Sequence, residues 1–250
     1  MRTGLLIGSN GGIAQALIVE LFQSGTVGHL HTVSRSANDL TAGPLSEYRS
    51  RITHHTINSQ NESEVIDFVA ACHTQDIKFD YVISTVGVLH QQVSDHVTLK
   101  PEKRLEDIDP VALAEYFAIN TIVPAIWLKH LLKVLPKSRA VIAFFSARVG
   151  SIEDNRLGGW YGYRASKSAL NMLIKNASIE YQRRNKHSIL ISYHPGTVAT
   201  GLSKPFQANV KPGKLFTPEF TAQCLIKQLH AAEVEQSPYY VDWDGQKIPW

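Results

Sequence analysis

Cysteine is nearly absent from this chain. Its 250 residues include only Cys72 and Cys224, which lie too far apart in the sequence to form a metal-ligand or CxxC motif. A disulfide-stapled scaffold is therefore excluded, and we expect both thiols to be buried apolar groups in a reducing, cytoplasmic compartment. The eleven histidines contain no HxxxH or HExxH pattern, so we predict no metal site.

Long hydrophobic runs and a strong excess of one charge are also missing. No apolar run approaches the ~20 residues of a membrane-spanning helix, and the run at residues 4–8 is too short for a signal sequence. The net charge is only +3, without a cluster of basic and aromatic residues, which argues against a nucleic-acid partner. With 44% hydrophobic and 19% charged residues, the chain is typical of a soluble globular protein without a membrane partner.

Short apolar runs alternate with segments of helical periodicity along the whole chain. No composition break or internal repeat interrupts them, so we predict one α/β domain over residues 1–250, a Rossmann-like doubly wound parallel sheet of about seven strands with helices on both faces. We expect a helix over residues 110–135 to be kinked by Pro124. The Pro- and Lys-rich residues 200–217 are predicted to be an irregular, mobile lid. The expected strands are 4–8, 30–33, 51–57, 79–83, 140–145, 189–193 and 238–243.

The first strand runs into a glycine-rich turn, Gly8–Ser9–Asn10–Gly11–Gly12, and then into a helix. In a parallel sheet, ligands bind at the carboxyl ends of the strands, where this turn lies. Gly8 permits a tight turn, and Gly12 lets a pyrophosphate approach the helix N-terminus. The alternative interpretation is a plain structural turn.

The end of the second strand bears on the choice of nucleotide. It reads Ser34–Arg35–Ser36, with no acid before Asp39. An acidic residue there would bind a ribose 2′-hydroxyl, whereas a guanidinium and two hydroxyls suit a 2′-phosphate. The sequence therefore favours NADP(H) over NAD(H). Alternatively, Arg35 stacks on adenine or faces solvent.

Other strand ends add candidate contacts. Asn58 could bind the adenine edge, Gly87 lets the backbone pass close to a ligand, and the turn from Pro195 to Thr200 could grip a carboxamide. The full set of candidate cofactor-binding residues is Gly8, Ser9, Asn10, Gly12, Ile13, Ser34, Arg35, Ser36, Asn58, Thr85, Val86, Gly87, Tyr163, Lys167, Pro195, Gly196, Val198 and Thr200.

Tyr163 and Lys167 are four residues apart in a predicted helix, so both side chains lie on one face. An ammonium beside a phenol should lower the pKa of the tyrosine and make it a usable acid and base. Such pairs also occur on solvated helix faces, without any function. The functional interpretation is favoured here because six strand-end loops are predicted to converge on the same crevice at the carboxyl edge of the sheet. Asn120, in the middle of a helix, is a candidate catalytic group or, alternatively, a residue that supports the kink at Pro124.

These residues together resemble the short-chain dehydrogenase/reductase family over nearly the whole chain. Residues 8–14 are similar to its glycine-rich motif, and GGWYGYRASKSALN is similar to the C-factor-like and carbonyl-reductase-like members. The resemblance implies hydride transfer between NADP(H) and a small carbonyl or alcohol. It further implies that Tyr163 is the acid/base, that Lys167 holds the ribose, and that Asn120 fixes a relay water.

Two departures from the family pattern affect this expectation. Ala147 occupies the usual position of a catalytic serine, which leaves Ser146 as the candidate hydroxyl and Ser151 as another; Ser84 and Thr85 replace an Asn pair. The alternative function is therefore a nucleotide-binding signalling or regulatory protein with little turnover. The resemblance also implies a homodimer or homotetramer.

Overall fold

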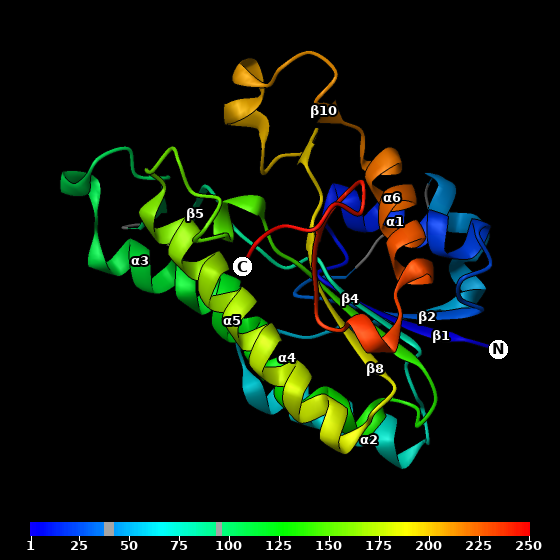
Figure 1. Ribbon diagram of the computed structural model, residues 1–250. Coiled ribbons are helices and arrows are strands. Elements are labelled where there is room, and N and C mark those ends of the chain that lie inside the picture. The colour runs from blue at the N-terminus through cyan, green and yellow to red at the C-terminus, as the bar shows by residue number, and fades with distance from the viewer. Residues whose placement is uncertain (38–42, 94–96) are drawn as a thin grey trace.

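A parallel sheet of seven strands forms the centre of the computed structural model, which describes residues 1–37, 43–93 and 97–250 (Figure 1). The strand order is β11–β8–β7–β4–β1–β2–β3, and every neighbouring pair is parallel. This confirms the predicted fold class. The strands are β1 (Thr3–Ile7), β2 (His29–Ser34), β3 (Ile52–Thr56), β4 (Tyr81–Ser84), β7 (Ala140–Phe145), β8 (Ser188–His194) and β11 (Tyr239–Asp242).

Helices cover both faces of the sheet. Figure 1 shows α1 (Gly12–Gln23) and α6 (Pro218–Ala231) together on one side. The other side carries α2 (Glu62–Thr74), α3 (Pro110–Phe117), α4 (Val123–Leu131) and α5 (Tyr161–Arg184).

Adjacent strand residues point into opposite cores, because side chains alternate along a strand. Leu6 packs in the cluster beneath α1 and α6, whereas Leu5 packs in the cluster beneath α2, α4 and α5. In the same way, Phe145 packs in the cluster beneath α1 and α6, and Phe144 packs in the cluster on the other side of the sheet. Since both faces are buried, the strands read in the sequence as continuous apolar runs.

The predicted helix over residues 110–135 is interrupted by a π-helical turn, Ala118–Ile122, which lies just before Pro124. Proline lacks an N–H, and its ring crowds the carbonyl four residues earlier, which here is that of Asn120. By length and composition alone Pro110–Val134 could cross a membrane. Its side chains Trp127 and Leu131 are fully buried in the domain, so the segment is a core helix.

Residues 200–217 are more regular than predicted. They contain a 3₁₀ helix (Lys204–Asn209) and the short strand β10 (Leu215–Phe216), which pairs in parallel with β9 (Thr197–Val198). A second small pair, β5 (Gln91–Gln92) with β6 (Thr98–Leu99), lies between β4 and α3, where the sequence predicts no strand. Sequence periodicity misses strands of two residues because they are too short to show alternation.

Candidate active site

A cleft of about 780 Å³ opens at the carboxyl ends of β1, β2 and β4. Many of the predicted cofactor residues line it: Gly8, Asn10, Gly12, Ile13, Ser34, Arg35, Ser36, Asn58, Thr85, Val86, Gly87 and Thr200. Four of the six predicted strand-end loops therefore meet around one cavity, and Thr200, at the end of the segment after β8, joins them.

The glycine-rich turn is shaped by Gly8. Its φ is +87°, and an added Cβ would lie 2.9 Å from Thr85 Oγ1. The N–H groups of Gly8 and Ser9 both donate to the carbonyl of Val33, at 2.8 and 3.1 Å, which ties β1 to β2. The helix α1 then begins at Gly12, and its N-cap Gly11 offers no side-chain cap. First-turn N–H groups beside the cleft favour an anion such as a pyrophosphate.

The loop after β2 is held by a small hydrogen-bond network. Ser34 Oγ donates to the Ser36 carbonyl at 2.6 Å, and Asn10 Nδ2 donates to Ser36 Oγ at 2.8 Å. Arg35 is exposed at the cleft, and no described residue forms an ion pair with it. A guanidinium without a carboxylate partner fits a phosphate group. Asp39 lies outside the described residues.

Lys167 lies behind Gly87; like Tyr163 and Asn120, it is buried and does not itself line the cleft. A Cβ on this glycine would lie 3.1 Å from Lys167 Nζ and 3.4 Å from Asn120 Oδ1. The lysine is buried, and its Nζ donates to the carbonyl of Phe145, a cleft-lining residue, at 2.9 Å. Burial lowers the pKa of Lys167 to about 7, because desolvation disfavours the ammonium.

Tyr163 is the third residue of α5 and is also buried. Its ring packs edge-on against those of Tyr116 and Trp160, with centroids 6.3 and 6.1 Å away. Burial raises the pKa of Tyr163 above its ordinary value, and the nearby Tyr240 phenol raises it further. The predicted lowering by Lys167 is therefore wrong for this structure: burial dominates the shift of the Tyr163 pKa, and Lys167 Nζ lies 5.9 Å from the centre of the Tyr163 ring.

Asn120 lies in the π-helical turn and is fully buried. Its Oδ1 accepts from the Val88 N–H at 2.8 Å, and its Nδ2 donates to the Val88 carbonyl at 3.0 Å and to Ser166 Oγ at 3.1 Å. The side chain therefore joins the loop after β4 to α5. Its place in the turn before Pro124 supports the structural alternative, and a catalytic role for Asn120 stays a prediction.

Ser146 lies on the far side of the backbone from Ala147. Its hydroxyl donates to Asn171 Oδ1 at 2.6 Å, whereas Ala147 packs in the cluster that contains Tyr163. The other candidate, Ser151, accepts from the Asp154 N–H at 3.0 Å. Neither serine lines the cleft.

The turn after β8 packs away from the cleft. Gly196 has a φ of +76°, and an added Cβ would lie 2.6 Å from the ring of Phe216 and 3.1 Å from Trp243. Of the predicted residues in this segment, Thr200 lines the cleft, while Pro195, Gly196 and Val198 do not.

His90 and Glu115 line the cleft and are absent from the predicted set. His90 Nε2 lies 3.1 Å from the Gly201 carbonyl, and its ring lies edge-on to Phe206. Phe206 also packs against Trp160, with centroids 5.0 Å apart. These contacts join residues 201–206 to the loop after β4, and no motif around His90 marks them in the sequence.

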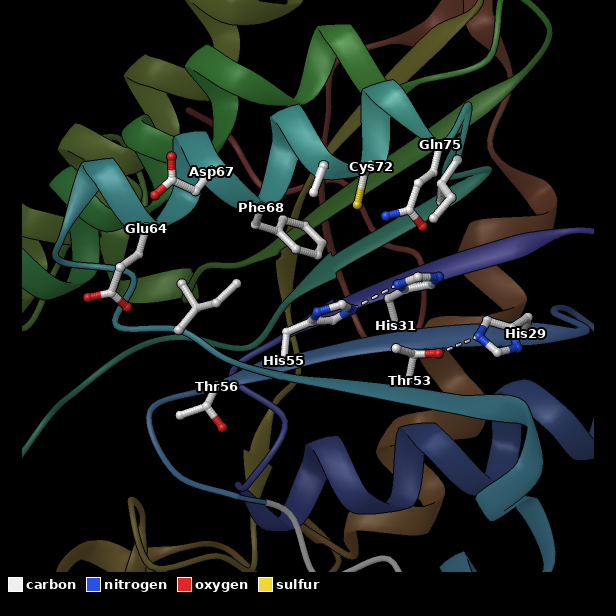
Figure 2. Close-up of a pocket in the computed structure, with 13 residues that line it drawn as sticks. His29, His31, Thr53, His55, Thr56, Glu64, Asp67, Phe68, Cys72 and Gln75 are labelled. Atoms are coloured by element: carbon white, nitrogen blue, oxygen red, sulfur yellow. Dashed lines mark hydrogen bonds between the residues drawn. The ribbon is translucent and has the colours of Figure 1, made fainter.

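A second cavity of about 580 Å³ lies between α2 and strands β2 and β3 (Figure 2). His31 Nδ1 lies 2.9 Å from His55 Nε2, and the rings are nearly parallel. Phe68 and Cys72 of α2 face them (Figure 2). In the described ranges, no group of three or more His, Cys, Asp or Glu residues is arranged to hold a metal ion.

The parallel sheet, the glycine-rich turn and the cleft define a Rossmann-like domain. The sequence profile of the short chain dehydrogenases matches residues 2–211, and the chain belongs to this family of oxidoreductases.

Two curated relatives and one solved structure illustrate the similarity. The chain is 28% identical to 1-hydroxy-2-glutathionyl-2-methyl-3-butene dehydrogenase of Rhodococcus sp. (strain AD45), over 100% of both chains. It is 29% identical to C-signal of Myxococcus xanthus over 58% of this chain and 83% of that protein. The NADPH-bound carbonyl reductase from chicken fatty liver has a TM-score of 0.80 at 19% identity, covering 100% of this chain and 94% of the other; this likeness concerns the fold.

Proposed function

We propose that the protein is an NADP(H)-dependent oxidoreductase that transfers hydride to or from a small carbonyl or alcohol substrate. One observation carries the proposal: Lys167 Nζ lies directly behind the cleft-lining residues Gly87 and Phe145, on the same helix as Tyr163. The dehydrogenase relative from Rhodococcus and the NADPH-bound reductase of the same fold support it.

The cleft fits the proposed cofactor. The open first turn of α1 would hold the pyrophosphate, and Arg35 with Ser34 and Ser36 would hold the 2′-phosphate. Asn58 would meet the adenine, and Lys167 the nicotinamide ribose. The segment containing Pro195, Gly196, Val198 and Thr200 would adjoin the carboxamide. When bound, NADPH supplies the hydride that the carbonyl carbon receives.

Proton transfer falls to the residues of α5. In the reducing direction Tyr163 donates its phenolic proton to the developing alkoxide, and its raised pKa keeps that proton in place beforehand. Lys167, with a pKa of about 7, can then return a proton from solvent near neutral pH. Asn120 holds Val88, the neighbour of Gly87, against α5 through hydrogen bonds to Val88 and Ser166, and so keeps Lys167 and Gly87 in their relative positions. Ser146 supports Asn171 from behind the site.

The test is Tyr163→Phe, assayed by NADPH oxidation with a panel of aldehydes and ketones. We expect turnover to fall by at least about 10³-fold, since the proton donor is lost, with NADPH affinity within a few-fold of wild type. Tyr161→Phe, in the same helical turn, is the matched control and should retain activity. A Tyr163→Phe protein with most of its activity would refute the assignment.

The alternative is a nucleotide-binding signalling protein with little turnover. Similarity to C-signal and the alanine at position 147 favour it. Tight NADPH binding without oxidation by any carbonyl in the panel would support this alternative over the enzyme.

We further propose a cytoplasmic homodimer or homotetramer. Ile122, Met172 and Ile179 expose apolar side chains on the long helices that the family resemblance associates with assembly. Sedimentation of wild type and of Met172→Glu would test this: the variant should dissociate.

A further inference from the structure

Glu102 carries a buried carboxylate without a cationic partner. The residue is 5% exposed, and no ion pair of the described residues includes it. Burial of an isolated carboxylate is strongly unfavourable unless hydrogen-bond donors replace its water. Both carboxylate oxygens accept from a single group, the Gly162 N–H, at 3.2 and 3.1 Å.

This contact lies at the start of α5, which lacks an ordinary N-cap. The N-cap residue Trp160 has a left-handed backbone, with φ +53°, and makes no side-chain cap hydrogen bond. Its N–H donates instead to the backbone carbonyl of Glu102. Glu102 thus supplies a backbone acceptor to the N-cap and a charged acceptor to the second helical residue. The positive end of a 24-residue helix dipole compensates the carboxylate.

The packing around Gly162 leaves no spare space. A Cβ there would lie 2.5 Å from the Tyr116 ring and 2.8 Å from Glu102 Oε1. The Tyr116 hydroxyl donates to the Leu89 carbonyl at 2.6 Å, and the ring lies edge-on to Tyr163. Glu102, Gly162 and Tyr116 therefore fix the backbone and one side of the ring of the very next residue, Tyr163.

We propose that Glu102 is a positioning residue for Tyr163: its buried carboxylate caps the first turn of α5 and so fixes the location of the phenol. This inference rests on the proposed role of Tyr163 as proton donor.

Glu102→Gln removes the charge and keeps the shape, whereas Glu102→Asp keeps the charge and shortens its reach. For Glu102→Gln, which still offers an acceptor to the Gly162 N–H, we expect kcat and KM within about two-fold of wild type. For Glu102→Asp, which is too short to reach this N–H, we expect kcat reduced about tenfold through misplacement of Tyr163, with KM unchanged. The matched control is Glu106→Gln, an exposed residue of the same loop, which should behave as wild type. NADPH affinity should remain within about two-fold in all three, because the changes lie outside the cleft lining.

A turnover-independent measurement separates this inference from the proposed function. The ¹³Cζ-tyrosine resonances of labelled protein are recorded by NMR at neutral pH, and Tyr163→Phe assigns the signal of Tyr163. The inference predicts that this signal moves in Glu102→Asp and keeps its wild-type position in Glu102→Gln. An unmoved Tyr163 signal in Glu102→Asp overturns it. If Tyr163→Phe stays active while the NMR shift is seen, the proposed function fails and the capping role of Glu102 stands.

Discussion

The side-chain amine of Lys167 lies directly beside the backbone of Gly87, so that a Cβ added to the glycine would be 3.1 Å from Nζ. Gly87→Ala should therefore push Nζ away from the Phe145 carbonyl that it now contacts at 2.9 Å. We expect kcat to fall about tenfold or more, since small misplacements at reacting groups are costly.

Gly4→Ala is the matched control for this substitution. Its Cβ would meet Leu30 at 2.8 Å, in the core rather than at the cleft. This variant should lower the melting temperature and leave kcat unchanged. Equal kcat values for Gly87→Ala and wild type would show that turnover does not depend on the observed position of Lys167.

Arg35 is exposed in the cleft and is the residue that we propose binds the 2′-phosphate. Arg35→Asp should weaken NADPH binding about 10- to 100-fold, because a guanidinium–phosphate contact becomes a repulsion, while NADH binding is kept or improved. Nicotinamide fluorescence titration measures both. Arg49→Asp makes the same charge change at another exposed site and should not alter the ratio. If the preference did not move in Arg35→Asp, the discrimination would have to lie elsewhere in the cleft.

Asn120→Ala should lower both stability and turnover. It leaves the buried N–H and carbonyl of Val88 without their partner, at a cost of about 1–3 kcal/mol in the free energy of unfolding. Urea unfolding measures this loss. Asn61→Ala removes the cap of α2, where Asn61 accepts from the Ser63 N–H, and should cost about 1 kcal/mol with normal turnover. If the Asn120→Ala enzyme kept wild-type turnover, Asn120 would have a role in stability and none in catalysis.

Ser146→Ala tests whether the serine that the sequence suggests is catalytic. Its hydroxyl is bonded to Asn171, so we expect steady-state kcat to stay within about three-fold of wild type. A loss of a hundred-fold or more would instead make Ser146 part of the proton-transfer machinery.

His31 makes stability depend on pH. Burial, with His55 and His29 adding to it, lowers the pKa of His31 from 6.5 to about 4. Between these values the unfolded chain binds a proton that the folded chain does not, so stability is full above pH 6.5 and falls toward pH 4, by about 3 kcal/mol in all.

His31→Gln should reduce that dependence by about 1.4 kcal/mol per pH unit between pH 6.5 and 4, measured by urea unfolding at several pH values. The exposed His187→Gln is the control and should retain the wild-type slope. An unaltered slope in His31→Gln would mean that other buried groups govern acid sensitivity.

The positions of the strand-end loops could be predicted because each follows an apolar run of strand length. Gly8, Ser34 and Gly87 all reach the cleft for this reason. The direction of the shift in the Tyr163 pKa could not be predicted. Spacing along a helix places two side chains on one face, but it does not tell how deeply that face is buried.

Contacts made across long sequence separations also escaped prediction. Glu102 lies 60 residues from Gly162, within a stretch that reads only as polar loop. His90 meets Gly201 across a separation of 111 residues. Such pairs follow from topology and leave no periodic pattern in the chain.

The division of neighbouring side chains between two hydrophobic layers, seen at Leu5 and Leu6, has a thermodynamic consequence. Both layers are anchored to the same strand backbones, so neither can lose its packing while the sheet keeps its shape. The two layers should melt in a single cooperative step. Leu5→Ala and Leu6→Ala, although they open cavities on opposite sides, should shift the same transition.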